Sequence, residues 1–355
     1  MLIAGMTDLK DAMTFAEAAE ASVPRSMYLP DGQFVMTADS GEGPPDNEVL
    51  GPVTPRGGPA GVIYHHGALR AQWGDAQRAD MTFSVAKSFL SLLTGLAVGD
   101  GLIESIDDKV AGYVADDGFK SPQNRDITWR HLLTQTSEWE GSVFGKEDRI
   151  DHNRVVGLAI PDAPKGTRRA LKTPGSFYEY NDVRVNRLSW SLLQVFREPL
   201  PAVLKRRIMD PIGASSTWRW DGYRSSTVTI DGKQMISVPG GGHWGGGIVI
   251  NALDLALMGL LVSRDGVWES KQILPPGWCA ELRKPCPVAP FYGLMWWLNT
   301  GKRQFAAASE QSYFALGWGS HIVWIEPAHD LVVVLRWIDR KKAPAFVEKL
   351  IGSLA

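Results

Sequence analysis

The most distinctive hydrophobic pattern in the chain lies in residues 83–99, FSVAKSFLSLLTGLAVG. Its apolar positions surround a helix almost completely and Lys87 is its only charged residue, which is typical of a helix buried in a core. Apolar residues at helical spacing recur near the C-terminus, and residues 8–22 have the composition of a helix. The other expected helices lie at residues 129–136, 183–197, 202–209 and 253–262.

Runs of β-branched and aromatic residues lie mainly toward the two ends of the chain. Residues 61–66 and 68–73 flank Gly67, and residues 227–230 and 234–238 flank an Asp-Gly pair, so each pair of runs predicts a hairpin. Strands at both ends with helices between them predict an α+β fold, with one antiparallel sheet built from both chain ends and an inserted helical subdomain. Three more β-like runs lie at residues 292–298, 321–325 and 331–337.

The composition is that of an ordinary globular protein. Among 355 residues, 44% are hydrophobic and 21% are charged, which supplies enough apolar material for a large core. Lys plus Arg number 37 and Asp plus Glu number 39, so the net charge is −2. Nucleic-acid binding needs a clustered positive surface, and the basic runs at 168–169 and 205–207 are short. We therefore expect no nucleic-acid partner.

Three features of the sequence indicate the cellular compartment and the need for a cofactor: the cysteines, the histidines and the first apolar run. Two cysteines, Cys279 and Cys286, are too few for a disulfide framework, so we expect free thiols in a reducing compartment. The seven histidines have no metal-binding spacing, and we expect no metal and no cofactor. The first apolar run is too short for a signal peptide, and no stretch approaches the roughly 20 apolar residues of a membrane span. A cytoplasmic protein without a membrane partner is expected, and an upstream leader stays an open alternative.

Ser84 and Lys87 are three residues apart at the start of the apolar helix, so their side chains lie on one face. A serine hydroxyl becomes a nucleophile when a neighbouring group takes its proton. Burial disfavours the ammonium form of a lysine, so an amine held against Ser84 can serve as that group. The backbone N–H groups at the helix start can also contribute to an oxyanion site. In the alternative interpretation, Ser84 caps the helix and Lys87 extends to the surface.

The segment around Ser84 and Lys87 also resembles a motif of a known family. Residues 81–102 resemble the S-x-x-K motif of the serine beta-lactamase and penicillin-binding-protein superfamily, and are most similar to its class C-like branch. That branch includes esterases, D-aminopeptidases and 6-aminohexanoate-dimer hydrolases. The resemblance runs from about residue 60 to the end and implies a beta-lactamase/transpeptidase-like fold without a cofactor. Further segments similar to the family lie at residues 106–110, 127–137, 174–180 and 209–213.

We assign residues 1–83 and 226–355 to the sheet subdomain and residues 84–225 to a mostly helical subdomain. The nucleophile helix then lies at the interface of the two, and together they form one catalytic unit.

Tyr180-Asn181-Asp182 occupies the place of the family's second motif, Y-x-N. The resemblance implies that Tyr180 moves protons, because a phenol near an ammonium ionises more easily. A buried core tyrosine is the alternative role for Tyr180, and Tyr178 is the alternative register. Asp182 replaces the family's asparagine, so either Asp182 holds Lys87 electrostatically or Asn181 faces the site instead.

The family's third motif is K-T-G or H-x-G on an edge strand, and residues 314–321 correspond to it. The resemblance implies that Gly317 allows a close backbone approach and that the N–H groups of Ser84 and Trp318 form the oxyanion hole. Ala315 and Leu316 replace the cation and the hydroxyl residue. Because that cation meets a substrate carboxylate in drug-binding relatives, its absence favours neutral esters or amides over classical β-lactams.

Several aromatic residues are candidates for the substrate pocket. His243 and Trp244 lie in a glycine cluster that resembles a wall of the family's active site, although a turn with a packed tryptophan fits equally well. The cluster matches G-x-G-x-x-G by letter but lacks the strand and helix of a dinucleotide site. Trp296 and Trp297 form a pair like that of nylon-hydrolase relatives, and core packing is their alternative role.

The chain is therefore expected to be a serine hydrolase that cleaves a carboxylic ester or amide through an acyl-enzyme on Ser84. The candidate catalytic residues are Ser84, Lys87 and Tyr180, and the candidate pocket residues are Asp182, His243, Trp244, Trp296 and Gly317. A 6-aminohexanoate-oligomer-type amidase, a D-aminopeptidase or a beta-lactamase-like activity is the alternative within this class. A ligand-binding relative without catalysis is the alternative outside it. No G-x-S-x-G elbow occurs, which excludes an α/β-hydrolase.

Overall fold

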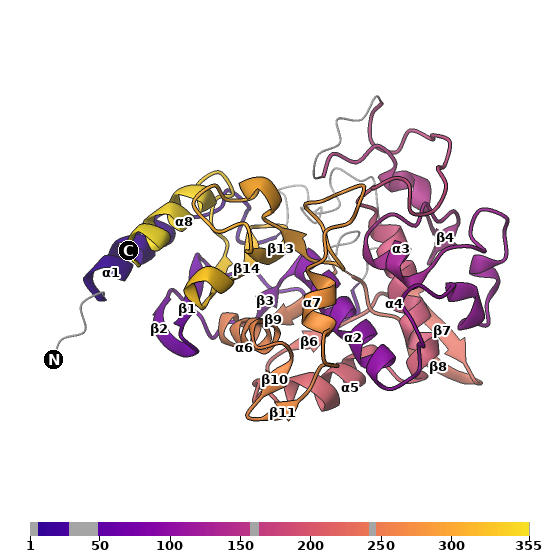
Figure 1. Ribbon diagram of the computed structural model, residues 1–355, viewed down its shortest axis with the longest axis horizontal. Coiled ribbons are helices and arrows are strands. Elements are labelled where there is room, and N and C mark those ends of the chain that lie inside the picture. Colours follow the sequence, from indigo (N-terminus) through magenta and orange to yellow (C-terminus); the bar gives the residue numbers. More distant parts are fainter. Residues whose placement is uncertain (1–5, 28–48, 157–162, 241–245, 355) are drawn as a thin grey trace.

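The computed structural model describes residues 6–27, 49–156, 163–240 and 246–354 (Figure 1). Its main sheet has six antiparallel strands in the order β12-β13-β14-β15-β1-β2. Ala60 at the start of β1 pairs with Arg336 at the end of β15, so the sheet joins the two ends of the chain as the sequence predicts. The strands are β1 (Ala60–His65), β2 (Ala68–Trp73), β12 (Trp297–Leu298), β13 (Tyr313–Gly317), β14 (His321–Glu326) and β15 (Leu331–Arg336).

Helices cover both faces of this sheet. All six residues of β15 are buried, and its neighbours Val332 and Val333 lie in different hydrophobic cores because successive strand residues point to opposite faces. One core lies under α6, and the other lies under α1 and α8, which run side by side in Figure 1. These helices are α1 (Met6–Glu17), α6 (Ala252–Ser263) and α8 (Ala343–Gly352).

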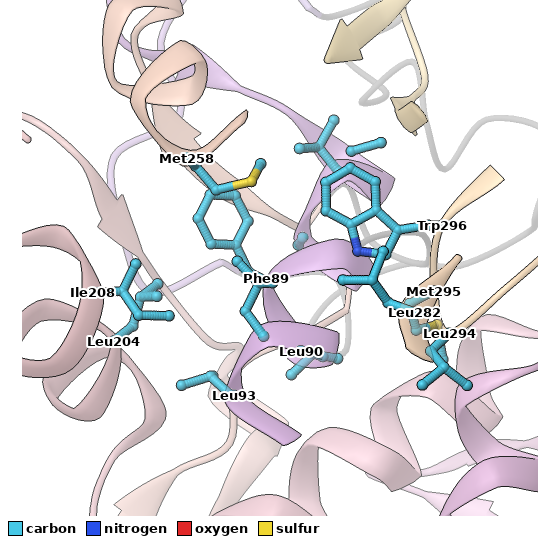
Figure 2. Close-up of a cluster of buried hydrophobic side chains, with 14 of the residues drawn as sticks. Phe89, Leu90, Leu93, Leu204, Ile208, Met258, Leu282, Leu294, Met295 and Trp296 are labelled. Atoms are coloured by element: carbon cyan, nitrogen blue, oxygen red, sulfur yellow. The ribbon is translucent and has the colours of Figure 1, made fainter. Parts of the chain in front are cut away.

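The buried helix α2 (Ala86–Gly99) connects the sheet to the helical part of the molecule. Figure 2 shows Phe89, Leu90 and Leu93 of α2 among side chains from the elements around it. Twelve of its fourteen residues are buried, so the apolar pattern predicts its environment correctly. Burying each large apolar side chain contributes about 1.5–3 kcal/mol, and these contacts fix α2 firmly in the core. Its helical neighbours are α4 (Asp182–Phe196), α5 (Leu200–Leu204) and α7 (Trp278–Leu282), whose Trp278 lies against Gly95 of α2. The short helix α3 (Trp129–Leu133) packs against α4, and the π-helical turn Lys205–Met209 continues α5.

Short strands form the rest of the regular structure. Asp231 and Gly232 both have positive φ in the β7–β8 hairpin, as a two-residue turn of this kind requires. The small sheet β3-β9-β6 lies beside the start of the nucleophile helix. The short strands are β3 (Asp80–Met81), β4 (Ser142–Val143), β5 (Lys146–Glu147), β6 (Arg219–Trp220), β7 (Thr227–Ile230), β8 (Lys233–Ile236), β9 (Ile248–Ile250), β10 (Val267–Trp268) and β11 (Lys271–Gln272).

The α+β class and the beta-lactamase/transpeptidase-like fold are confirmed, with local differences. The helix expected at residues 8–22 is α1, which ends at Glu17. Of the expected run 292–298, the structure forms a strand at Trp297–Leu298, because Met295 has a φ of 60° and the chain turns there. Residues 313–317 form a strand, which the hydrophobic pattern did not predict but which the resemblance of residues 314–321 to the family's third motif implies. The division into subdomains at residues 83/84 and 225/226 stays a prediction. Within the described residues, no helix is long and apolar enough to cross a membrane.

Candidate active site

Ser84 lies in a single 3₁₀ turn, Phe83–Val85, that leads directly into α2. The residue before it, Phe83, is fully buried and has a φ of 52°, a left-handed conformation that costs a bulky residue about 1–3 kcal/mol. Packing compensates for this strain, because the Phe83 ring makes edge contacts with Trp318 and Trp337 at centroid distances of 5.1 and 6.3 Å. Ser84 itself is half-buried, so the residue is partly open to solvent.

The Lys87 side chain lies against Ser84, as the i, i+3 spacing predicts. Its Nζ donates a hydrogen bond to Ser84 Oγ at 2.9 Å. Lys87 is 2% exposed, which is inconsistent with a lysine that extends to the surface. The structure therefore brings the candidate nucleophile and a buried amine into direct contact.

Asp182, and not Asn181, faces Lys87. Its Oδ1 lies 2.5 Å from Lys87 Nζ, and the carboxylate is fully buried. Asn181 instead caps α4, accepting a hydrogen bond from the backbone N–H of Arg184 at 3.1 Å. Of the two arrangements that the sequence left open, the structure has the one in which Asp182 pairs with Lys87.

Tyr180 is the tyrosine that lies beside Lys87. The lysine Nζ is 4.8 Å from the centroid of the Tyr180 ring, and Trp297 packs against that ring at 5.6 Å. The alternative, Tyr178, is buried against Phe291, and burial raises its pKa well above the usual value. Tyr178 is thus a neutral phenol in the aromatic cluster, and the geometry favours Tyr180 as the phenol of the site.

Arg154 is a site residue that the sequence reasoning missed. Its Nη1 lies 2.5 Å from Asp182 Oδ2 and 3.3 Å from Asp151 Oδ2, and its Cζ is 5.2 Å from the centroid of the Tyr180 ring. Burial opposes its charge, but Asp151 and Asp182 raise the pKa of Arg154 above its usual value. Asp182 was the one signal for Arg154 in the sequence, because a carboxylate in place of an asparagine needs an additional cation as its partner.

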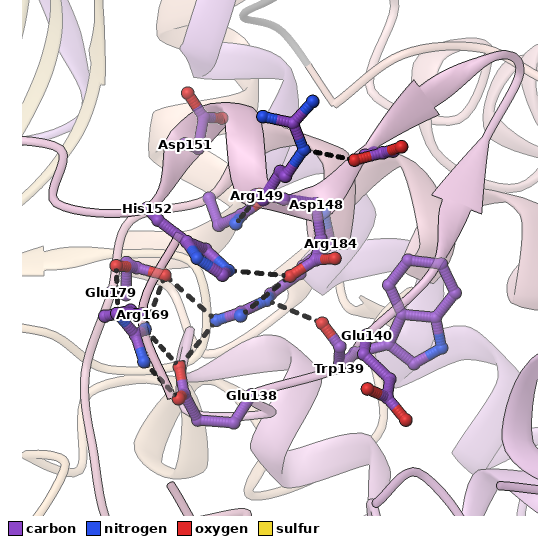
Figure 3. Close-up of polar contacts among 12 residues, drawn as sticks. Glu138, Trp139, Glu140, Asp148, Arg149, Asp151, His152, Arg169, Glu179 and Arg184 are labelled. Atoms are coloured by element: carbon purple, nitrogen blue, oxygen red, sulfur yellow. Dashed lines mark hydrogen bonds and ion pairs between the residues drawn. The ribbon is translucent and has the colours of Figure 1, made fainter. Parts of the chain in front are cut away.

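A buried network of charges supports this side of the site (Figure 3). Arg184 bonds to Glu138 at 2.8 Å and to Asp148 at 3.2 Å, and Arg169 bonds to Glu138 at 2.6 and 2.7 Å. Asn181 joins the network by donating to the backbone carbonyl of Asp148 at 2.8 Å. Arg184, which is fully occupied in these ion pairs, cannot supply the cation that the third motif lacks.

The end of β13 packs against the 3₁₀ turn that holds Ser84. A Cβ atom on Gly317 would lie 2.1 Å from the backbone oxygen of Thr82, so a glycine is needed at this contact, as the resemblance implies. The short β12 pairs with Tyr313 and Phe314, and the last residues of β13 have β14 as their described partner. Trp318 follows directly and is partly exposed, and its backbone N–H remains our proposed second oxyanion donor.

Trp296 lies in the core and not on a pocket wall. Its indole is fully buried and packs against Tyr313 at 5.6 Å, as part of the cluster in Figure 2. Its neighbour Trp297 points to the other side and joins Tyr180, because adjacent residues of an extended chain face opposite directions. His243 and Trp244 lie outside the described residues.

The described residues hold no group that could bind a metal ion. Three or more His, Cys, Asp or Glu side chains do not come together in residues 6–27, 49–156, 163–240 and 246–354 in a metal-binding arrangement. Cys279 and Cys286 are both free and buried. Burial raises the pKa of the Cys279 thiol to about 12, which keeps it protonated at neutral pH.

A serine and a buried lysine lie at the start of a core helix, beside a tyrosine and the end of β13. This arrangement defines the class of beta-lactamase-like serine hydrolases. The Beta-lactamase family model matches residues 56–348, and the chain belongs to this family. No curated protein sequence matches the chain significantly.

Several solved structures share the fold. A beta-lactamase from Mycobacterium bovis is 18% identical, with a TM-score of 0.60 over 83% of this chain and 94% of that one. A putative 6-aminohexanoate-dimer hydrolase from Bacillus anthracis is 18% identical, with a TM-score of 0.56 over 87% and 78%. EstCE1, a hydrolase with promiscuous acyltransferase activity, is 17% identical, with a TM-score of 0.57 over 83% and 93%.

Proposed function

We propose that the protein cleaves a carboxylic ester through an acyl-enzyme on Ser84. The observation that carries this proposal is the 2.9 Å hydrogen bond between Lys87 Nζ and the half-buried hydroxyl of Ser84. A hydroxyl that is both accessible and in contact with a proton-carrying group has the arrangement of an activated nucleophile.

In the proposed reaction, Ser84 Oγ attacks the ester carbonyl while its proton passes to the Lys87–Tyr180 pair. The backbone N–H groups of Ser84 and Trp318 stabilise the negative charge on the carbonyl oxygen. The proton then goes to the departing alcohol, leaving the acyl group on Ser84. Water attacks the acyl-enzyme in the second half, and the same pair takes its proton and returns one to Ser84.

Neutral esters are the proposed substrates because Ala315 and Leu316 give the third motif no cation. Both residues lie on β13, beside Gly317 and next to the nucleophile turn. Arg184 is held by Glu138 and Asp148 and cannot replace the missing charge. The aromatic surface around Tyr180 and Trp297 suits an uncharged group.

An amidase acting on 6-aminohexanoate oligomers is the second candidate within the same mechanism. The similarity of fold to the putative 6-aminohexanoate-dimer hydrolase favours it. D-aminopeptidase and beta-lactamase-like activities use the same acyl-enzyme and differ in the substrate. A ligand-binding protein without catalysis is the alternative of another class.

A substrate panel separates these candidates. The purified protein is assayed with p-nitrophenyl esters of increasing acyl length, with linear 6-aminohexanoate amides and with a chromogenic cephalosporin. We expect the short-chain esters to give the highest kcat/KM. Faster cleavage of the amides would assign the second candidate, and no turnover with any substrate, together with no labelling by a fluorophosphonate, would support a binding protein.

A further inference from the structure

The carboxylate of Asp182 is shared between two cations. Its Oδ1 lies 2.5 Å from Lys87 Nζ, and its Oδ2 lies 2.5 Å from Arg154 Nη1. Its backbone N–H donates to Asp151 Oδ2 at 2.8 Å, and Arg154 also reaches that oxygen, at 3.3 Å. A fully buried carboxylate is costly unless its oxygens are paired. Arg154 therefore stabilises the oxygen of Asp182 that Lys87 does not use.

The same guanidinium lies over the ring of the candidate proton carrier. Arg154 Cζ is 5.2 Å and Lys87 Nζ is 4.8 Å from the centroid of Tyr180, so two cations approach one phenol. The other tyrosines nearby, Tyr178 and Tyr292, have pKa values raised well above the usual value by burial, so both stay neutral. Among the described residues, Lys165 is a further charged neighbour of this cluster, and its Nζ is 3.2 Å from Asp151 Oδ1.

We propose, on the basis of the proposed hydrolase function, that Arg154 is a positioning residue that acts through Asp182. It holds Asp182 so that Oδ1 faces Lys87 and fixes the amine against Ser84, and its charge favours loss of a proton from the Lys87–Tyr180 pair. Arg154 thereby compensates for the replacement of the family's asparagine by a carboxylate. It does not need to contact the substrate.

The test compares Arg154→Met in two backgrounds. In the otherwise unchanged protein, removing a cation favours proton binding at its neighbours, so the acid limb of the kcat/KM profile moves to higher pH. We expect a shift of about one pH unit, which is about a ten-fold loss on that limb. In the Asp182→Asn background the guanidinium keeps Asp151 as a partner but no longer has the carboxylate through which it would act on Lys87. Arg154→Met is there expected to cost less than about two-fold or to increase activity.

Two matched variants control for charge and for folding. Arg154→Lys keeps the charge, and we expect its acid limb to lie closer to that of the unchanged protein than to that of Arg154→Met. Arg149→Met removes an exposed arginine that pairs with Glu147 in the same segment, and we expect no change of the profile. Thermal unfolding and the fraction of protein labelled by a fluorophosphonate correct each rate for misfolded protein.

The inference is overturned if Arg154→Met leaves the pH profile in place, or if it causes the same loss in both backgrounds. An equal loss would mean that Arg154 acts independently of Asp182, for example by supporting the fold. These outcomes are distinct from a failure of the proposed function, in which the unchanged protein itself would show no labelling and no turnover.

Discussion

In the proposed mechanism, the amine of Lys87 must exchange a proton at the position that it occupies. It contacts Ser84 Oγ at 2.9 Å and Asp182 Oδ1 at 2.5 Å, so it links the nucleophile to a buried carboxylate. A guanidinium at this position keeps the positive charge but does not release a proton at working pH. We therefore expect Lys87→Arg to lower kcat/KM by at least about a hundred-fold.

The measurement for Lys87→Arg is ester hydrolysis from pH 5 to 10, corrected for the folded fraction. The control is Lys302→Arg, which changes an exposed lysine of a surface turn and should leave the rate unchanged. Nearly full activity in Lys87→Arg at every pH would show that Lys87 has a structural role alone.

At the scale of elements, the contact between β13 and the nucleophile turn should control catalysis. A Cβ on Gly317 would lie 2.1 Å from the Thr82 oxygen, so Gly317→Ala must push the strand away from the turn. A misplacement of about 1 Å at a reacting group can cost about a hundred-fold in rate. We expect a loss of ten- to a hundred-fold in kcat, measured with a p-nitrophenyl ester.

The control for Gly317→Ala is Gly112→Ala, where nothing lies within 4 Å of the added Cβ and the rate should not change. If Gly317→Ala retained full kcat, the backbone of β13 would not contribute to the oxyanion site in the proposed way.

The sequence predicts those elements whose pattern is local. The apolar helix with Ser84 and Lys87 is one example, because an i, i+3 pair and a continuous apolar run are both read from neighbouring residues. Arg154 could not be found in this way, because its partner Asp182 lies on another element, 28 residues along the chain. The roles of Trp296 and Trp297 also depend on which side of the chain each one faces. A short irregular run has no regular pattern from which that direction could be predicted.

At the scale of the whole molecule, the buried network of Figure 3 should make stability depend on pH. Burial alone would raise the pKa of Glu138, but Arg169 and Arg184 outweigh it and hold that pKa below its usual value of 4.5. A carboxyl whose pKa is lowered in the folded state stabilises the fold above its unfolded pKa. This contribution is then lost as the pH falls below about 4.5 through the folded value.

We expect Glu138→Gln to lower the free energy of unfolding at pH 7 by about 3 kcal/mol, because it removes a buried charge that pairs with both Arg184 and Arg169. The loss should be smaller at pH 3.5, because the carboxyl is then largely protonated in the unfolded chain and part of its contribution to folding is already lost. Urea unfolding at both pH values measures this difference, with the exposed Glu140→Gln as the control. An equal loss at both pH values would contradict the assigned charge state of Glu138.

The substrate preference is also a property of the whole site. With Ala315 and Leu316 in the third motif and Arg184 bound in ion pairs, we expect kcat/KM for a neutral p-nitrophenyl ester to exceed that for nitrocefin by at least about a hundred-fold. A nitrocefin rate equal to the ester rate would show that another cation receives the carboxylate, and Arg303, which is exposed, would be the first residue to substitute.

The measurement that tests the central claim most directly is the site of covalent labelling by a fluorophosphonate, read by peptide mass spectrometry. We expect one adduct, on Ser84, in the unchanged protein and none in Ser84→Ala. Ser91→Ala is the matched control, because it removes a buried hydroxyl from the same helix that has no hydrogen-bond partner among the described residues. Labelling of Ser84 with loss of turnover in Ser84→Ala supports the acyl-enzyme mechanism. Full esterase activity in Ser84→Ala, or an adduct on another residue, would contradict it.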